Sequence, residues 1–350
     1  MKNLTLILFA FFFNSILCSS QDKKGLNHNL FGFCTSNSFT YVNTLDSSFL
    51  NKAHRINPQV LRFPGGTIGN FYHPRKSGYG FQLSDVEEWY SGRFSHRVRT
   101  LKNAAIKRGH TEDYLEDFIR LCKDMNAKII LNANILTGDL DDMIYLVNRF
   151  INEDIEVLGV ELGSELSNRA YKKKISSVND YIKIAKKYAA NIKYHFPNIK
   201  IGVVSSPIRN NTPFRLRDWN KDLAKEDFYD AIVHHSYHKV VDGVADAGVM
   251  ISEKTVYKKK DQIFNTYKDR LILEMESGFS DRILEYQQIY GDKEIWITEW
   301  NLQMTKTTGN TLLQSLFVAH YLLNIVSDNN FQNIKLATYH NLAGRDLSGS

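Results

Sequence analysis

The chain has 350 residues, of which 43% are hydrophobic and 12% aromatic, so it is long enough for one large α/β domain or two ordinary ones. Its formal net charge of +6 is a mild excess, which does not by itself indicate a nucleic-acid partner. Only Cys34 and Cys122 remain after the first twenty residues, which argues against a disulfide framework or a Cys/His zinc site and predicts two buried free thiols.

The first twenty residues have the pattern of a secretory signal peptide. Lys2 gives a positive start, residues 4–13 are apolar, and Cys18-Ser-Ser20 supplies small residues for cleavage. Asn14 interrupts the apolar run, which is also short for a membrane span. We therefore expect residues 1–20 to be removed and residues 21–350 to be secreted, periplasmic or located at the cell surface, without a membrane span.

Strand and helix patterns alternate along the remaining chain. Strands are expected at residues 29–34, 58–64, 128–134, 157–165, 200–205, 230–237, 295–297 and 334–339. Helices are expected at residues 45–56, from Thr111 onward, and at 139–151, 178–196, from about 253, 280–290 and 311–326. Such alternation predicts parallel strands, and eight units predict a closed (β/α)8 TIM barrel. An open doubly wound sheet is the alternative, but no Gly-rich phosphate fingerprint follows the first strand.

Two segments depart from this alternation. Residues 67–110 form a long connection that should lie over the active face. Its basic side chains predict either a solvated loop or an anionic glycan site, and its aromatic residues are candidate sugar platforms. Almost nothing remains after Asn341, so this chain is expected to lack the last helix of the barrel or a C-terminal β-sandwich domain. The basic residues are Arg75, Lys76, Arg93, Arg97, Arg99, Lys102, Lys107 and Arg108, and the aromatic ones are Tyr72, Tyr79, Phe81 and Trp89.

Polar and aromatic residues follow most of the predicted strands. The C-terminal ends of the strands in a barrel form one rim, where catalytic groups lie. A purely structural barrel has no need for such a rim, so we expect an active site there. The residues at these ends are Arg62, Asn132, Asn134, Glu161, Glu165, His235, Tyr237, Glu299, Trp300, Tyr339, His340 and Asn341.

Two carboxylates, Glu165 and Glu299, each follow an apolar strand. Burying an unpaired charge is costly, so each carboxylate is either a partner in a salt bridge or a catalytic group. Two facing carboxylates are the minimum for glycoside hydrolysis, one as acid and one as nucleophile. A spacing of roughly 5 Å would predict retention of configuration, and a wider gap would predict inversion. We interpret Glu161 as a structural ion-pair partner.

Three runs of residues resemble those of clan A glycoside hydrolases: Leu61-Arg-Phe-Pro-Gly-Gly66, Val160-Glu-Leu-Gly-Ser-Glu165 and Trp296-Ile-Thr-Glu-Trp-Asn301. The resemblance is closest to the branch that holds α-L-arabinofuranosidases and heparanase-like β-glucuronidases. It implies a retaining barrel enzyme without metal or organic cofactor.

The resemblance also assigns roles to single residues. Glu165 would be the acid/base and Glu299 the nucleophile. Arg62 would hydrogen-bond Glu299, and His235 and Tyr237 match the pattern on the sixth strand.

One position departs from that family. Ser164 stands where the family usually has an asparagine whose amide binds the 2-hydroxyl of the substrate. The change implies a different sugar, help from Asn132 or Asn134, or reduced activity.

Trp300 is expected to line a sugar subsite. The sequence therefore predicts a secreted retaining glycoside hydrolase acting on a polysaccharide or oligosaccharide. The alternative is a carbohydrate-binding barrel that has lost turnover.

Overall fold

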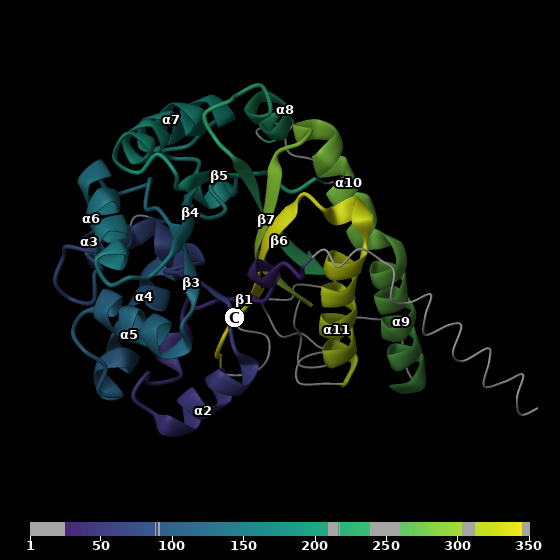
Figure 1. Cartoon of the computed structure of the whole chain (residues 1–350), viewed down its shortest axis with the longest axis horizontal. Helices are drawn as coiled ribbons and strands as arrows, with labels where there is room; N and C mark the ends of the chain where they lie inside the picture. The colour runs from purple at the N-terminus through teal and green to yellow at the C-terminus, as the bar shows by residue number, and fades with distance from the viewer. Residues whose placement is uncertain are drawn as a thin grey trace, which may run out of the picture.

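The computed structural model of the chain describes residues 25–87, 89, 92–208, 216, 218–238, 260–302 and 312–344. Eight parallel strands close into a barrel in chain order, with β1 paired to β8. The predicted TIM barrel is therefore confirmed (Figure 1). The strands are β1 (Gly32–Cys34), β2 (Val60–Phe63), β3 (Lys128–Asn132), β4 (Val157–Leu162), β5 (Lys200–Val204), β6 (Ala231–His238), β7 (Glu294–Leu302) and β8 (Ile334–His340).

Helices surround the barrel, as Figure 1 shows, with α3 to α6 on one side and α9 to α11 on the other. The α-helices are α2 (Ser47–Ile56), α3 (Leu83–Glu87), α4 (Arg93–Lys107), α5 (Tyr114–Met125), α6 (Leu140–Ile151), α7 (Val178–His195), α8 (Trp219–Leu223), α9 (Lys260–Leu273), α10 (Phe279–Tyr290) and α11 (Leu312–Ser327). Short 3-10 helices are η1 (His28–Leu30), η2 (Ser38–Thr40), η3 (Thr67–Phe71), η5 (Arg169–Tyr171) and η10 (Asn329–Phe331), and η9 (Glu274–Gly278) is a π-helix.

Side-chain caps define where several of these helices begin. Asp139 caps α6, and Ser177 and Asp180 form a reciprocal capping box at α7. Helix α5 begins at Tyr114, later than the expected start at Thr111, because Asp113 caps it and accepts the hydrogen bond from Leu115 N–H. Helices α6 and α7 begin within one residue of the predicted positions, directly after their capping residues Asp139 and Ser177.

One large side chain, that of Trp296, packs inside the barrel near the N-terminal ends of the strands. Trp296 packs with small and branched residues of the other strands: Val60, Ile130, Ala231, Val233 and Leu336. Its ring lies against Gly159 and Gly202, where an added Cβ would meet ring atoms at 2.3 and 2.7 Å. The two glycines therefore make room for the indole. Because side chains fill the interior of the barrel, a ligand can bind only at its rim.

Residues 67–110 are not a simple loop. They contain η3, α3 and α4, and α4 buries Phe94, Val98, Leu101 and Ala105 at helical spacing. The aromatic residues Tyr72, Tyr79, Phe81 and Trp89 are all at most 8% exposed and belong to the core. They pack largely around Tyr114 of α5, so their prediction as sugar platforms was wrong.

The remaining expectations have mixed outcomes. Cys34 and Cys122 are buried free thiols, as predicted. Residues 1–20 and the predicted helix start near 253 lie outside the described residues. Among the residues that are described, no helix is long and apolar enough to span a membrane. The described chain continues for only four residues past β8, to Gly344, and these form no helix.

Candidate active site

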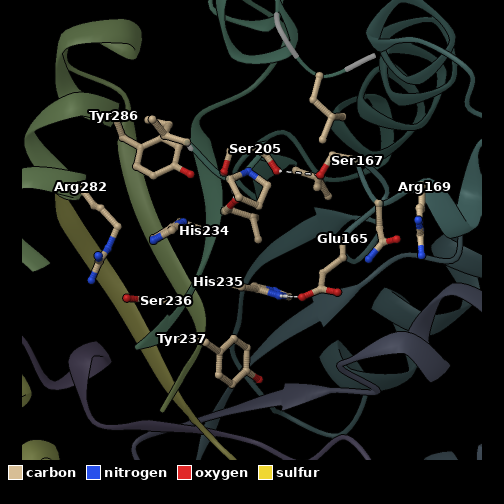
Figure 2. Close-up of a pocket in the computed structure, with 16 residues that line it drawn as sticks. Glu165, Ser167, Arg169, Ser205, His234, His235, Ser236, Tyr237, Arg282 and Tyr286 are labelled. Carbon is tan, nitrogen blue, oxygen red and sulfur yellow. Dashed lines mark hydrogen bonds and ion pairs between the residues drawn. The ribbon is translucent and has the colours of Figure 1, made fainter. Parts of the chain in front are cut away.

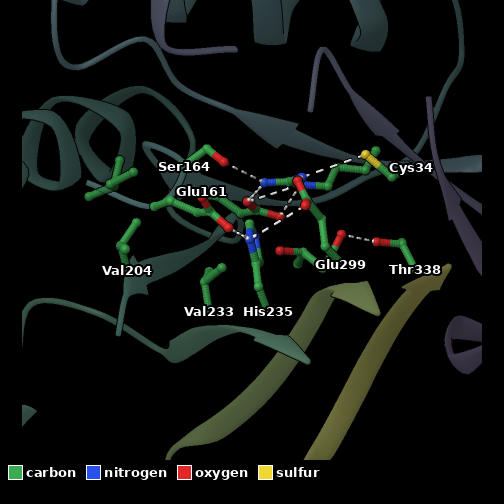
Figure 3. A network of polar contacts seen from close by, with 12 residues as sticks. Cys34, Glu161, Ser164, Val204, Val233, His235, Glu299 and Thr338 are labelled. Carbon is green, nitrogen blue, oxygen red and sulfur yellow. Dashed lines mark hydrogen bonds and ion pairs between the residues drawn. The ribbon is translucent and has the colours of Figure 1, made fainter. Parts of the chain in front are cut away.

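A buried arginine connects two strand-end carboxylates. Arg62 on β2 is 0% exposed, and its Nε and Nη2 donate to Glu161 at 2.7–3.1 Å. Its Nη1 donates to Glu299 Oε1 at 2.6 Å. Figure 3 shows this network with Cys34 at its edge. The ion pair expected for Glu161 is present, and the guanidinium is shared between two acids.

The Glu299 carboxylate is surrounded by positive groups and donors. The Tyr237 hydroxyl donates to Oε2 at 2.7 Å, and His235 Nδ1 and His340 Nδ1 lie 3.6 and 3.7 Å from the same oxygen. Burial would raise the pKa of this carboxyl, but His235, His340 and Arg62, with the Tyr237 hydrogen bond, hold the pKa well below its ordinary value. Glu299 is therefore ionised, as a nucleophile must be.

The Cys34 thiol adds no charge to this network. It lies 3.6 Å from Arg62 Nη1, and burial raises its pKa to about 12 although the guanidinium acts in the opposite direction. The thiol therefore stays neutral beside the carboxylate at ordinary pH.

Glu165 occupies a different setting. It lies in the turn after β4, three residues past Leu162, and its backbone is in the left-handed region with φ of 50°. Its side chain is 46% exposed, and Oε1 lies 3.0 Å from His235 Nδ1 (Figure 2). One oxygen of Glu165 lies within 4.8 Å of an oxygen of Glu299. This close spacing resembles that of retaining glycosidases.

His235 bridges the two carboxylates. Burial would lower the pKa of its imidazole, but Glu299 and the hydrogen bond with Glu165 raise it. The protonated ring can donate to Glu165 while it stabilises the charge on Glu299. The structure thus brings together four predicted site residues, Glu165, His235, Tyr237 and Glu299, around Arg62.

A cavity of roughly 770 Å³ opens beside this cluster (Figure 2). Glu165, Arg169, His235 and Tyr237 are among the residues that line it. Residues that follow β5 and residues of α10 also line it: Ser205, Pro207, Ile208, Arg282 and Tyr286. Its volume is in the range of ordinary ligand pockets, and Glu165 is placed to act on a molecule bound there.

Two predicted asparagines do not line this cavity. Asn132 and Asn134 line a separate and much smaller one near α6. The Asn134 amide donates to the Tyr72 carbonyl and the Thr137 hydroxyl and accepts from Thr137 N–H. Its polar atoms therefore hold the connection after β2 in place.

Trp300 is a further correction. It is 1% exposed, stacks on Tyr321 of α11 at 4.3 Å and meets Tyr339 edge-on at 5.0 Å. Since β7 continues to Leu302, Trp300 points to the opposite face of the strand from Glu299. The tryptophan belongs to the packing between barrel and helix and does not line a sugar subsite.

Sequence reasoning missed Asn70. This residue of η3 is 0% exposed and hydrogen-bonds both backbone groups of Ser164, the residue before Glu165. Ser164 itself is 1% exposed, and its hydroxyl lies 3.5 Å from Arg62 Nη2. In the sequence, Asn70 is an ordinary asparagine four residues after Gly66, and no local pattern marks its contact with Ser164.

Several basic residues of segment 67–110 already have acidic partners. Arg75 pairs with Asp139 and Asp142, and Arg99 pairs with Glu87. Arg97 lies 3.4 Å from the Thr67 hydroxyl, at the start of η3. The charge of the segment is thus partly used in holding it to the barrel, which favours the structural interpretation for Arg75 and Arg99.

Two groups of side chains place ligand-type atoms within 4.8 Å of one another: Cys34, Glu299 and His340, and Glu165, His235 and Glu299. Both include Glu299, which already accepts hydrogen bonds from Arg62 and Tyr237. The Arg62 guanidinium, whose Nη1 lies 2.6 Å from Glu299 Oε1, would repel a second cation at either group. The donor set therefore fits an anionic nucleophile better than a metal centre.

Comparison with solved structures finds the same barrel in glycoside hydrolases. The GH51 α-L-arabinofuranosidase from Thermotoga petrophila RKU-1 is 18% identical with a TM-score of 0.56, and the alignment covers 91% of this chain and 66% of that one. The GH51 arabinofuranosidase from Xanthomonas axonopodis pv. citri is 14% identical with a TM-score of 0.58, covering 90% and 66%.

A more distant match is the GH family 44 endoglucanase from Clostridium thermocellum, at 11% identity and a TM-score of 0.50, covering 90% of this chain and 73% of that one. No protein-family model and no curated protein sequence matches the chain. The chain spans 66% of the length of the first arabinofuranosidases. At these identities the comparison shows the fold, and this fold agrees with the resemblance to clan A glycoside hydrolases.

Proposed function

We propose that this protein is a retaining glycoside hydrolase that uses Glu299 as nucleophile and Glu165 as acid/base. The observation that carries the proposal is the pair of carboxylate oxygens within 4.8 Å of one another. One carboxylate is buried and held ionised, and the other is exposed beside a cavity. Glycoside hydrolysis with retention needs one ionised carboxylate as nucleophile and a second that can give a proton to the leaving oxygen.

The mechanism follows from the positions of these groups. Glu299 attacks the anomeric carbon while protonated Glu165 gives its proton to the leaving oxygen, so the glycosidic bond breaks as the bond to Glu299 forms. Glu165, now a carboxylate, then takes a proton from water, which attacks the same carbon and releases Glu299. Arg62 and the Tyr237 hydroxyl hold the Glu299 carboxylate in place through both steps.

The substrate that we propose is a polysaccharide or one of its oligosaccharides. The solved neighbours are described as arabinofuranosidases and endoglucanases, which supports a glycan substrate. Arg169, which lines the cavity together with Glu165, supports an anionic glycan. We also propose secretion through residues 1–20, on the pattern of the signal peptide. Equal affinity for neutral and acidic glycans of one length, without salt dependence, would exclude the anionic preference.

A second candidate is a carbohydrate-binding barrel without turnover. Ser164 favours it, because its buried hydroxyl lies next to Arg62 and no amide stands at that position. The missing contact to the 2-hydroxyl would remove several kcal/mol of transition-state stabilisation, on the order of what this class of enzyme gains there.

The test is hydrolysis of a panel of aryl glycosides and polysaccharides by the purified chain, beside Glu299→Ala and Glu165→Ala. The proposal expects one substrate to be cleaved by the wild type, both variants to lose that activity, and the first product seen by NMR to keep the anomeric configuration. Binding of a glycan by all three proteins without cleavage would support the binding barrel instead.

A further inference from the structure

The segment after Gly66 reaches across the rim to the loop that follows β4. Asn70 Nδ2 donates to the Ser164 carbonyl at 2.8 Å, and Asn70 Oδ1 accepts from the Ser164 N–H at 2.9 Å. The two residues are 94 positions apart in the chain. One buried amide thus satisfies both backbone polar groups of Ser164, as a neighbouring strand would, at the point where β4 has ended.

The clamped residue directly precedes Glu165, whose backbone is in the left-handed region. A residue other than glycine costs about 1–3 kcal/mol in such a conformation, and it persists only where its surroundings hold it. Asn70 fixes the backbone on one side of Glu165. On the other side, Asn168 N–H donates to the Glu165 carbonyl at 2.8 Å and closes the turn.

The chemistry of position 70 is specific for an amide. Two separate atoms must donate and accept to bind both groups of Ser164, and the asparagine amide provides them, whereas a serine or threonine hydroxyl has a single oxygen for both. The second Nδ2 hydrogen bond goes to the Tyr171 hydroxyl at 3.0 Å, in the same loop as Glu165. Gly69 allows the close approach, because a Cβ there would lie 2.0 Å from Asn132 Oδ1.

We propose that Asn70 is a positioning residue for the Glu165 carboxyl, which it aims at the leaving oxygen. This inference rests on the proposed function, since it assigns to Asn70 a part in proton donation. Attack by Glu299 does not depend on Asn70, because Glu299 is held by Arg62 and Tyr237. Loss of Asn70 therefore impairs protonation of the leaving group and leaves the nucleophile in place.

The experiment compares two glycosides of the sugar that the wild type cleaves. One carries a phenyl group, which needs a proton to leave, and the other a 2,4-dinitrophenyl group, which leaves without one. The variants are Asn70→Ala and Asn70→Asp, where the aspartate keeps the shape and the acceptor but loses the donor. Glu165→Ala gives the full effect of losing the acid.

Asn220→Ala is the matched control. Asn220 binds the backbone N–H and C=O of Ser206 at 2.8 and 2.9 Å, so it makes the same two-point clamp on the loop after β5. It touches neither carboxylate in the part of the chain that the structure describes. Its loss should lower the melting temperature and change hydrolysis of both glycosides by the same factor.

The proposal expects Asn70→Ala to lower kcat/KM on the phenyl glycoside about 10- to 100-fold, and on the dinitrophenyl glycoside by at most about threefold, as a partial loss of general acid catalysis. An equal decrease on both glycosides in both Asn70 variants would overturn it, as would a pattern like that of Asn220→Ala. If Glu165→Ala shows the leaving-group dependence and the Asn70 variants do not, only this inference fails. If the wild type cleaves no glycoside of the panel, the proposed function fails and the inference with it.

Discussion

Glu299 lies inside strand β7 and is 5% exposed, whereas Glu165 lies in a turn past the end of β4 with a side chain that is 46% exposed. The first carboxylate is held by side chains, through Arg62 and Tyr237. The second has His235 as its side-chain partner, and its backbone lies between Ser164, which Asn70 binds, and the turn to Asn168. The barrel thus keeps the proposed nucleophile buried and ionised and leaves the proposed proton donor open to the cavity.

The largest expected effect is on activity. Glu299→Ala should lower kcat on the order of 10⁵-fold with every leaving group, the scale of losing a covalent nucleophile. Glu165→Ala should lower kcat/KM about 10²–10⁴-fold where the leaving group needs a proton, and far less where it does not, because kcat/KM does not include the attack by water in the second step. Added azide should then give glycosyl azides of opposite configuration in the two variants, inverted for Glu299→Ala and retained for Glu165→Ala. Identical azide products would contradict the assignment of roles.

The next effect is on stability. Arg62→Met leaves Glu161 and Glu299 buried without their counter-charge, which should cost about 3–5 kcal/mol of the free energy of unfolding in urea. Adding Glu161→Gln should restore part of that loss. Lys200→Met is the control, because the exposed Lys200–Glu294 pair should contribute only about 0–1 kcal/mol. Similar losses in Arg62→Met and Lys200→Met would show that the buried network is not what holds Glu299.

A smaller effect is expected at Tyr237. Tyr237→Phe removes a hydrogen bond to an ionised carboxylate, and kcat should fall about 10- to 100-fold. The pKa of Glu299 should rise, so the acidic limb of the pH–activity profile should move to higher pH. Tyr290→Phe, which removes a hydroxyl bonded to Asn220, should leave both the rate and this limb unchanged. An unshifted acidic limb in Tyr237→Phe would argue against its contact with the nucleophile.

The pH dependence of stability should be the most modest effect. The lowered pKa of Glu299 contributes stability that is present above the unfolded value of about 4.3 and is lost as the pH falls below it. The raised pKa of His235 contributes stability that is present below about 6.5 and is lost as the pH rises through its folded value. Urea unfolding of wild type, Glu299→Gln and His235→Gln across this range should show the two slopes with opposite sign. A pH-independent difference between wild type and either variant would exclude the corresponding shift.

The sequence was sufficient for the barrel and for much of its rim. Short apolar runs predict buried parallel strands, and polar residues such as Arg62 and Glu299 at or near the ends of these runs predict the rim. Both patterns are local in the sequence, so they could be recognised without the structure. Trp300 was misplaced because its strand was taken to end early. Once β7 runs to Leu302, alternation of side chains places Trp300 against α11.

Two other features could not be predicted in the same way. The Asn70 clamp joins residues 94 positions apart, and no local pattern predicts a pairing at that distance. The left-handed conformation of Glu165, next to that clamp, was equally hidden. Helix α4 is different, because Phe94, Val98, Leu101 and Ala105 had the spacing of a buried helical face and could have been recognised.

The left-handed backbone of Glu165 has a consequence for work with inactive variants. Glycine adopts this conformation without steric cost, so Glu165→Gly should fold at least as well as the wild type while it loses the proton donor. Removing Glu299 instead leaves the Arg62 guanidinium short of a partner in the core. Crystals with an intact oligosaccharide are therefore best sought with position 165. Glutamate at position 165 thus costs the folded chain stability that glycine there would recover.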